Sequence, residues 1–167
     1  VVRCCDDGDV THVEGRVDPI ADIDTIETEV MLGDLDSLEK RVIALEKRVR
    51  GNDKEAKETL DLVERSLKLL RDGKPARLVE RKPEEEKLFH SLGLLTAAPV
   101  LYVCNVDEGS AATGNALSAK VEAKARSENA ESVVICAAIE AEIAQLSSEE
   151  QREFLERAVF QPIDSQA

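Results

Sequence analysis

Two short stretches follow predicted strands and carry the groups best suited to bind a ligand. The first, Asn105-Val106-Asp107-Glu108, comes directly after the apolar run 99–104. The second begins at Ala137-Ala138, directly after the strand-like run 132–136. An amide both donates and accepts hydrogen bonds, and a carboxylate accepts them. Asn105 and Glu108 therefore suit the edge of a purine base, while the two alanines are small enough to let backbone amides approach it.

The identity of residues 106 and 108 favours adenine over guanine. In GTPases this location holds Asn-Lys-x-Asp, and the Asp accepts hydrogen bonds from guanine N1–H and the exocyclic amine. Here Val106 replaces the Lys and Glu108 replaces the Asp, which displaces the carboxylate by one methylene. Asn105 can still bond N7 and N6 of adenine, as amides do. Polar loops often follow strands and two alanines often begin a helix, so spacing alone leaves ordinary structure as the alternative.

The periodicity around these stretches predicts a parallel α/β unit. A strand at 99–105, a helix at 115–130 and a strand at 132–136 make a βαβ unit, which has a right-handed crossover by default. Two more helices are predicted at 137–146 and 147–157, the second with a capping box at Ser147 and Glu150. Val1–Cys5 is expected to be the end of another buried strand. Ligands of such sheets bind at the carboxyl ends of the strands, where Asn105 and Ala137 lie.

The region between residues 18 and 72 predicts a long antiparallel helical hairpin. Asp18-Pro19 is a helix start, Gly51-Asn52 interrupts the pattern, and Asp53 can cap a second helix. Gly73-Lys74-Pro75 ends it. Both helices repeat apolar residues at alternating spacings of four and three, the pattern of a coiled-coil seam. The predicted seam residues are Met31, Leu35, Leu38, Val42, Leu45 and Val49, facing Ala56, Leu60, Val63, Leu67 and Leu70.

Composition limits the classes of function. The 167 residues hold 22 Lys and Arg against 35 Asp and Glu, a net charge of -13, which argues against non-specific binding to DNA. No apolar run is long enough to span a bilayer. The four cysteines show neither C-x-x-C spacing nor a nearby His cluster. We therefore expect reduced thiols on buried strands rather than metal ligands, and a cytoplasmic protein.

Several distinctive stretches, taken in order, resemble the YchF or Obg-like ATPase family over residues 1–157. They are Val2-Arg3-Cys4, the run 12–19, the run 22–29, Leu94 to Val100, Asn105 to Glu108 and Cys136 to Ala141. The resemblance implies an α/β fold: part of a P-loop NTPase (G-domain) parallel sheet with an inserted antiparallel α-helical coiled-coil hairpin. It implies ATP as the nucleotide, with base contacts at Asn105, Val106, Glu108, Ala137 and Ala138. It also implies association with the ribosome and a role in translation or stress responses.

The same resemblance gives His12 a role. The family lacks the usual catalytic glutamine, and a histidine in its His-Val-x-Gly loop is proposed to position the attacking water. His12-Val13-Glu14-Gly15 matches that loop. A packing or surface histidine is the alternative for His12, and we assign His90 no role.

The phosphate-binding motifs of the family do not occur in these residues. There is no Gly-x-x-x-x-Gly-Lys-Ser/Thr and no Asp-x-x-Gly, and phosphates and Mg²⁺ are bound through such loops. We therefore expect a fragment without the P-loop and the C-terminal TGS domain, inactive alone. Its expected parts are strand and loop 1–17, hairpin insertion 18–81, the base-recognition part 82–157 and a divergent tail 158–167.

Two further alternatives remain at this level. The chain can instead be a non-enzymatic interaction protein in which the hairpin is the working part. Basic residues gather toward the hairpin tip, at Lys40, Arg41, Lys47, Arg48 and Arg50. They either contact ribosomal RNA or are solvated flanks of the heptads, interleaved with acidic residues.

Overall fold

The computed structural model describes residues 1–5 and 17–153. Two compact units divide the chain: Val1–Ile20 with Leu101–Ala167, and Ala21–Val100. His12, the end of the helix predicted over 147–157 and the tail predicted over 158–167 lie outside the described residues. The four-part division into domains stays a prediction.

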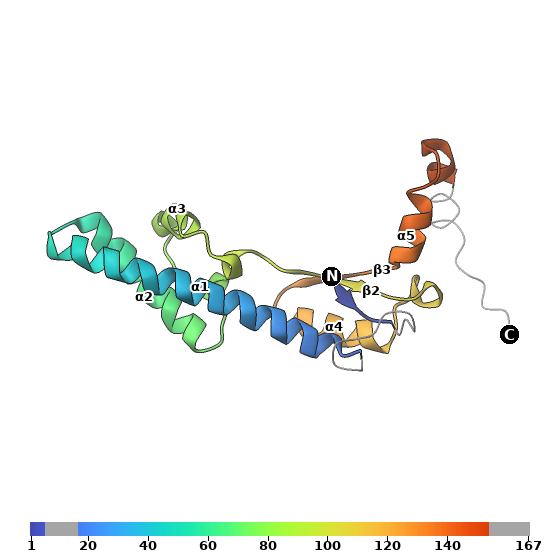
Figure 1. Ribbon diagram of the computed structural model, residues 1–167, viewed down its shortest axis with the longest axis horizontal. Coiled ribbons are helices and arrows are strands. Elements are labelled where there is room, and N and C mark those ends of the chain that lie inside the picture. Colours follow the sequence, from blue (N-terminus) through green and yellow to red (C-terminus); the bar gives the residue numbers. More distant parts are fainter. Residues whose placement is uncertain (6–16, 154–167) are drawn as a thin grey trace. The chain divides into compact units, whose positions relative to one another are not determined.

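The first unit contains a parallel sheet of three described strands (Figure 1). They are β1 (Val2–Arg3), β2 (Leu101–Asn105) and β3 (Glu131–Ile135), in the order β1-β2-β3. Val2 pairs with Cys104, and Tyr102 pairs with Ser132. Helix α4 (Ala116–Ser127) connects β2 to β3 and packs against both strands, as the predicted βαβ unit requires. Helix α5 (Ala137–Ile143) follows β3.

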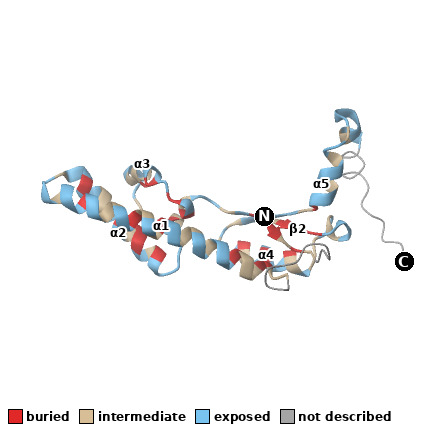
Figure 2. Ribbon diagram, in the orientation of Figure 1, coloured by how far each residue is buried: buried red, intermediate tan, exposed pale blue. Residues whose placement is uncertain are grey.

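The sheet is covered on the face where α4 packs (Figure 2). Tyr102 and Cys104 are buried, as are Val121 and Ala125 on α4. The prediction of a buried strand is therefore right for alternate residues of β2. It is wrong for β3, whose Val133 and Val134 are 42% and 39% exposed. These side chains are exposed because β3 is the last described strand of the sheet and has β2 as its single neighbour.

The second unit contains the predicted helical hairpin. Helix α1 runs over Pro19–Arg50, with its first two residues in the other unit, and α2 over Lys54–Arg71. Asp53 caps α2, since its side chain accepts a hydrogen bond from the backbone N–H of Ala56 at 3.1 Å. Arg71, at the end of α2, reaches back to Glu39 on α1 at 2.9 Å. The two helices are therefore antiparallel.

The predicted seam forms the hydrophobic core of this unit. Leu38, Leu45, Ala56, Val63, Leu67 and Leu70 are buried, and the other five predicted seam residues pack against them. Burying each large apolar side chain contributes roughly 1.5–3 kcal/mol. The core also includes residues from outside the seam, namely Leu62, Ala76, Val79, Phe89, Leu92 and Leu94. Supercoiling of the two helices stays a prediction of the heptad pattern.

The segment after the hairpin is folded onto α2 in short pieces. The single helix predicted over 82–95 is instead a 3-10 turn at Pro83–Glu85 followed by α3 (Glu86–Ser91). Gly93 ends α3 early, because its φ of +63° is a left-handed conformation that continues no helix. Two more 3-10 turns, Ala76–Leu78 and Leu95–Ala97, flank this segment.

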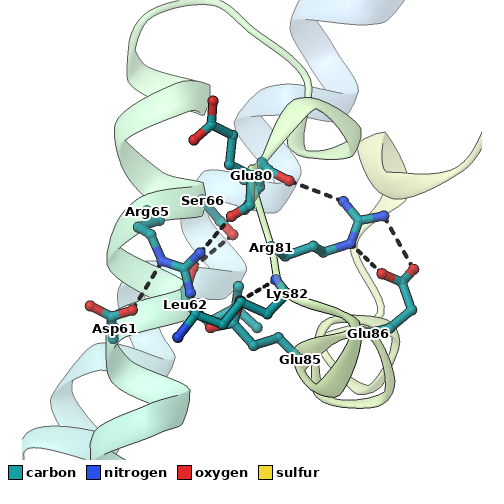
Figure 3. A network of polar contacts seen from close by, with 10 residues as sticks. Asp61, Leu62, Arg65, Ser66, Glu80, Arg81, Lys82, Glu85 and Glu86 are labelled. Carbon is teal, nitrogen blue, oxygen red and sulfur yellow. Dashed lines mark hydrogen bonds and ion pairs between the residues drawn. The ribbon is translucent and has the colours of Figure 1, made fainter.

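Two arginines hold the segment in place (Figure 3). Arg65 on α2 donates to Asp61, to the carbonyl of Glu80 and to Glu85. Arg81 donates to Glu86 and lies over the ring of Phe89, 4.2 Å from its centroid. Hydrogen bonds from the Lys82 backbone and from Arg65 hold the pKa of Glu85 below its usual value. The carboxylate of Glu85 thus stays ionised and ties the 3-10 turn to α2.

Candidate functional site

The carboxyl ends of β2 and β3 are joined by the side chain of Asn105. Its Oδ1 accepts a hydrogen bond from the backbone N–H of Ala137, at the start of α5, at 2.9 Å. Next to it, Val106 donates its backbone N–H to the carbonyl of Ile135 at 2.9 Å, and its side chain is buried. These bonds fix the orientation of the Asn105 amide. Because Oδ1 is the accepting atom, the two Nδ2 hydrogens remain the donors of this amide.

The two acidic residues of this loop have different surroundings. Asp107 caps the 3-10 turn Glu108–Ser110, since its Oδ1 accepts from the backbone N–H and the hydroxyl of Ser110, both at 3.0 Å. Glu108 is the first residue of that turn and is exposed. The loop therefore uses the Asp107 carboxylate for its own structure and presents Glu108 to solvent.

The far end of the loop is fixed by Asn115, which is not among the predicted site residues. Its Oδ1 caps α4 by accepting from the backbone N–H groups of Leu117 and Ser118, each at 3.0 Å. Its Nδ2 donates to the carbonyl of Cys4, directly after β1, at 2.6 Å. An Asn just before a helical pattern is a cap signal, but nothing in the sequence points to a partner 111 residues away.

Two of the four cysteines, Cys4 and Cys104, are poorly suited to chemistry. All four are free thiols, with Cys4, Cys104 and Cys136 buried and Cys5 partly exposed. Burial, together with the neighbouring Cys104, raises the pKa of Cys4 to about 12. Burial also raises the pKa of Cys104. A thiol with so high a pKa stays protonated at neutral pH and is a poor nucleophile and metal ligand.

The donors and acceptors present fit a purine base but not a magnesium ion. Asn105 offers its Nδ2 hydrogens beside the exposed residues Ala137 and Ala138, and Glu108 adds an exposed carboxylate. Five of the six predicted site residues therefore belong to one unit, and the sixth, His12, lies outside the described residues. Within residues 1–5 and 17–153, no group of His, Cys, Asp or Glu could hold a metal ion. We assign no magnesium site to these residues.

The chain is similar in sequence to bacterial proteins named ribosome-binding ATPase YchF. It is 44% identical to the protein of Bacillus subtilis over 163 residues, which are 96% of this chain and 44% of that protein. It is 44% identical to the protein of Haemophilus influenzae over 156 residues, and 36% identical to that of Escherichia coli O157:H7 over the same length. No protein-family model matches the chain.

The fold is similar to a solved structure titled as the YchF GTPase of Schizosaccharomyces pombe. The TM-score is 0.78 with 29% sequence identity, covering 93% of this chain and 44% of that one. The chain thus spans less than half the length of the relatives that it matches. The names of these relatives differ over the nucleotide, ATP in the bacterial proteins and GTP in the yeast one.

Proposed function

Because this chain belongs to the YchF family over the part that it spans, we propose that it carries the base-binding half of the ATP site of a cytoplasmic, ribosome-associated ATPase. The observation that carries the proposal is the hydrogen bond between Ala137 and Asn105 Oδ1. It turns the Asn105 amide so that Nδ2 can donate to N7 of a purine. One lone pair of Oδ1 is still available to accept from the adenine N6 amine.

The choice of ATP over GTP rests on the loop that follows β2. Guanine needs an acceptor for its N1–H and its 2-amino group, and adenine has neither of these two donors. Asp107 is engaged with Ser110, so Glu108 is the remaining carboxylate of the motif, and it is one methylene longer than the aspartate that reads guanine. Val106 is buried, so an apolar side chain stands where the guanine-binding motif has a lysine.

The ribosome as partner rests on the names of the relatives. The basic residues at the hairpin tip add limited support, because three of the five are in ion pairs within the hairpin. Lys40 pairs with Asp36, while Arg48 and Arg50 pair with Asp53 and Glu46. Within the described residues no helix is long and apolar enough to cross a membrane.

The base preference can be tested in a chimera in which this chain replaces the 163 aligned residues of the Bacillus subtilis relative. Calorimetry on the chimera should give tighter binding of ATP than of GTP. The double substitution Val106→Lys and Glu108→Asp should shift the ratio of the two affinities toward GTP by about tenfold, roughly 1.4 kcal/mol. Glu131→Asp is the control for Glu108→Asp, because it makes the same substitution at the first residue of β3, at the end of the strand away from Ala137. It should leave the ratio of the two affinities unchanged. An unaltered ratio in the double variant would remove residues 105–108 from the site.

A further inference from the structure

Both ends of the loop between β2 and α4 are attached to the same residue, Cys4. At the start of the loop, the carbonyl of Asn105 accepts the backbone N–H of Cys4 at 2.8 Å. At its end, Asn115 Nδ2 donates to the carbonyl of Cys4 at 2.6 Å. Cys4 itself has no exposed surface. The two polar backbone groups of one buried residue therefore hold the two ends of a loop that lies more than a hundred residues away in the sequence.

The approach to Asn115 is itself constrained. Gly114 has a φ of +72°, and a Cβ there would stand 2.6 Å from the hydroxyl of Ser118. That hydroxyl accepts the backbone N–H of Asn115 at 2.8 Å, and the backbone N–H of Ser118 bonds Asn115 Oδ1 in return. The capping box leaves the Asn115 side chain one orientation, with Oδ1 on the helix and Nδ2 on Cys4.

We propose that Asn115 is a positioning residue that clamps the base-binding loop to the end of β1. This rests on the proposed function, since the clamp matters through the loop that carries Asn105 and Glu108. Preorganised groups bind more tightly because less conformational freedom is lost on binding. The clamp keeps the Asn105 amide aligned with Ala137 before the base arrives.

A helix cap needs one side-chain acceptor, whereas Asn115 supplies an acceptor and a donor. Asn, Asp and Ser cap helices about equally well, because each offers a side-chain oxygen. The bond to Cys4 needs a donor at the same time, and the Asn amide carries its acceptor and its donor on two separate atoms. Asn115→Asp therefore keeps the cap but places an oxygen against the carbonyl of Cys4. Asn115→Ser also keeps the cap without adding a charge, but its single, shorter hydroxyl cannot bond the helix and reach the carbonyl of Cys4 at the same time.

The test uses the full 167-residue chain, ¹⁵N-labelled, with AMP as the probe. The wild-type chain should show shifts of the Ala137 and Val106 amide signals on titration with AMP. In Asn115→Asp and Asn115→Ser the dissociation constant should rise about tenfold or more, while helical content stays the same. Asp53→Asn, which swaps the same two side chains at the cap of α2, should leave AMP binding unchanged.

A second readout separates the clamp from the proposed function. Amide hydrogen exchange at Cys4 and Val106 should be faster in both Asn115 variants than in the wild type. If AMP binds neither the wild type nor the variants, the proposed base site is wrong. The exchange rates alone then test whether Asn115 holds the loop to Cys4. If the wild type does bind AMP, an unchanged AMP affinity in the Asn115 variants would overturn the inference. Unchanged exchange at Cys4 in Asn115→Ser would overturn it as well. If Asn115→Asp does not fold, the Asn115→Ser result stands by itself.

Discussion

Asp34 is a buried carboxylate in the middle of the long helix α1, only 2% exposed. Its Oδ1 accepts the backbone N–H of Leu95, and its Oδ2 accepts the backbone N–H and the hydroxyl of Thr96, at 2.6–2.8 Å. The Thr96 hydroxyl in turn accepts the backbone N–H of Ala76 at 3.0 Å. One side chain thus satisfies the polar groups of the 3-10 turn that leads out of the hairpin unit.

Replacing Asp34 by Ala should destabilise this unit strongly. The change leaves the Leu95 and Thr96 donors without their acceptor, and hydrogen bonds to a charged group contribute about 1.5–3 kcal/mol each. Since the change also removes the cost of burying a charge, we expect a total loss of about 2–4 kcal/mol in a urea unfolding curve. Asp36→Ala, two residues along the same helix, removes an exposed carboxylate paired with Lys40 and should change stability by less than about 0.5 kcal/mol. Equal effects of the two substitutions would contradict the role of Asp34.

At the scale of single residues, the sequence predicts local chemistry better than long-range partners. The positions of Asn105 and Glu108, at and just after the end of β2, follow from the apolar run before them, while their role at a base stays a prediction. The Ser147–Glu150 capping box is confirmed by the bond between the two side chains at 2.7 Å. The bonds of Asp34 and Asn115 join residues 61, 62 and 111 positions apart. No local pattern encodes such a pairing, because it depends on how the elements pack.

The helical hairpin is the element that the sequence predicts best. Its two heptad seams each repeat over many turns, and the signals at Asp18-Pro19, Gly51-Asn52 and Asp53 mark its ends. Every predicted seam residue lies in the core or packs against it. The elements predicted less well, the helix over 82–95 and the buried strand β3, are short. Their form depends on neighbours rather than on periodicity.

Leu38 provides a direct measure of the seam. It is fully buried, so Leu38→Ala removes buried methyl groups and leaves a cavity, at a cost of about 2–5 kcal/mol. Ile43 lies on the same helix but is 62% exposed, and Ile43→Ala should cost less than about 0.5 kcal/mol. Thermal unfolding followed by far-ultraviolet circular dichroism checks both variants. A melting temperature unmoved by Leu38→Ala would show that the seam does not bear on stability.

At the scale of the whole chain, the sheet unit exposes more apolar surface than a parallel sheet normally does. Parallel sheets are usually covered on both faces, yet Leu101 is 54% exposed and Val133 is 42% exposed. Helix α5 has no fully buried side chain. Exposed apolar side chains on a sheet favour association with another surface. The purified chain is therefore expected to self-associate as its concentration rises.

Whether the chain can hydrolyse ATP depends on which groups the whole chain contains. Phosphoryl transfer depends on positioning the phosphates and stabilising their charge, through P-loop amides, a Lys and Mg²⁺ ligands. None of the family's phosphate-binding motifs occurs in the 167 residues. Contacts to the base alone should give a dissociation constant no tighter than about 1 mM, roughly -4 kcal/mol. An aligned water beside an unanchored γ-phosphate gains nothing, so His12 cannot replace the missing groups.

We therefore expect no release of phosphate above background from the purified chain with ATP and Mg²⁺. The chimera with the Bacillus subtilis relative should hydrolyse ATP, because it supplies the rest of that protein around this chain. In the chimera, His12→Ala should lower turnover while ATP affinity stays within about threefold, since a water-positioning group acts on the reaction more than on binding. His90→Ala is the matched control, because His90 is the other histidine and its side chain is 72% exposed on α3. Turnover by the isolated chain that disappears in His12→Ala would show instead that these residues hold a complete phosphate site.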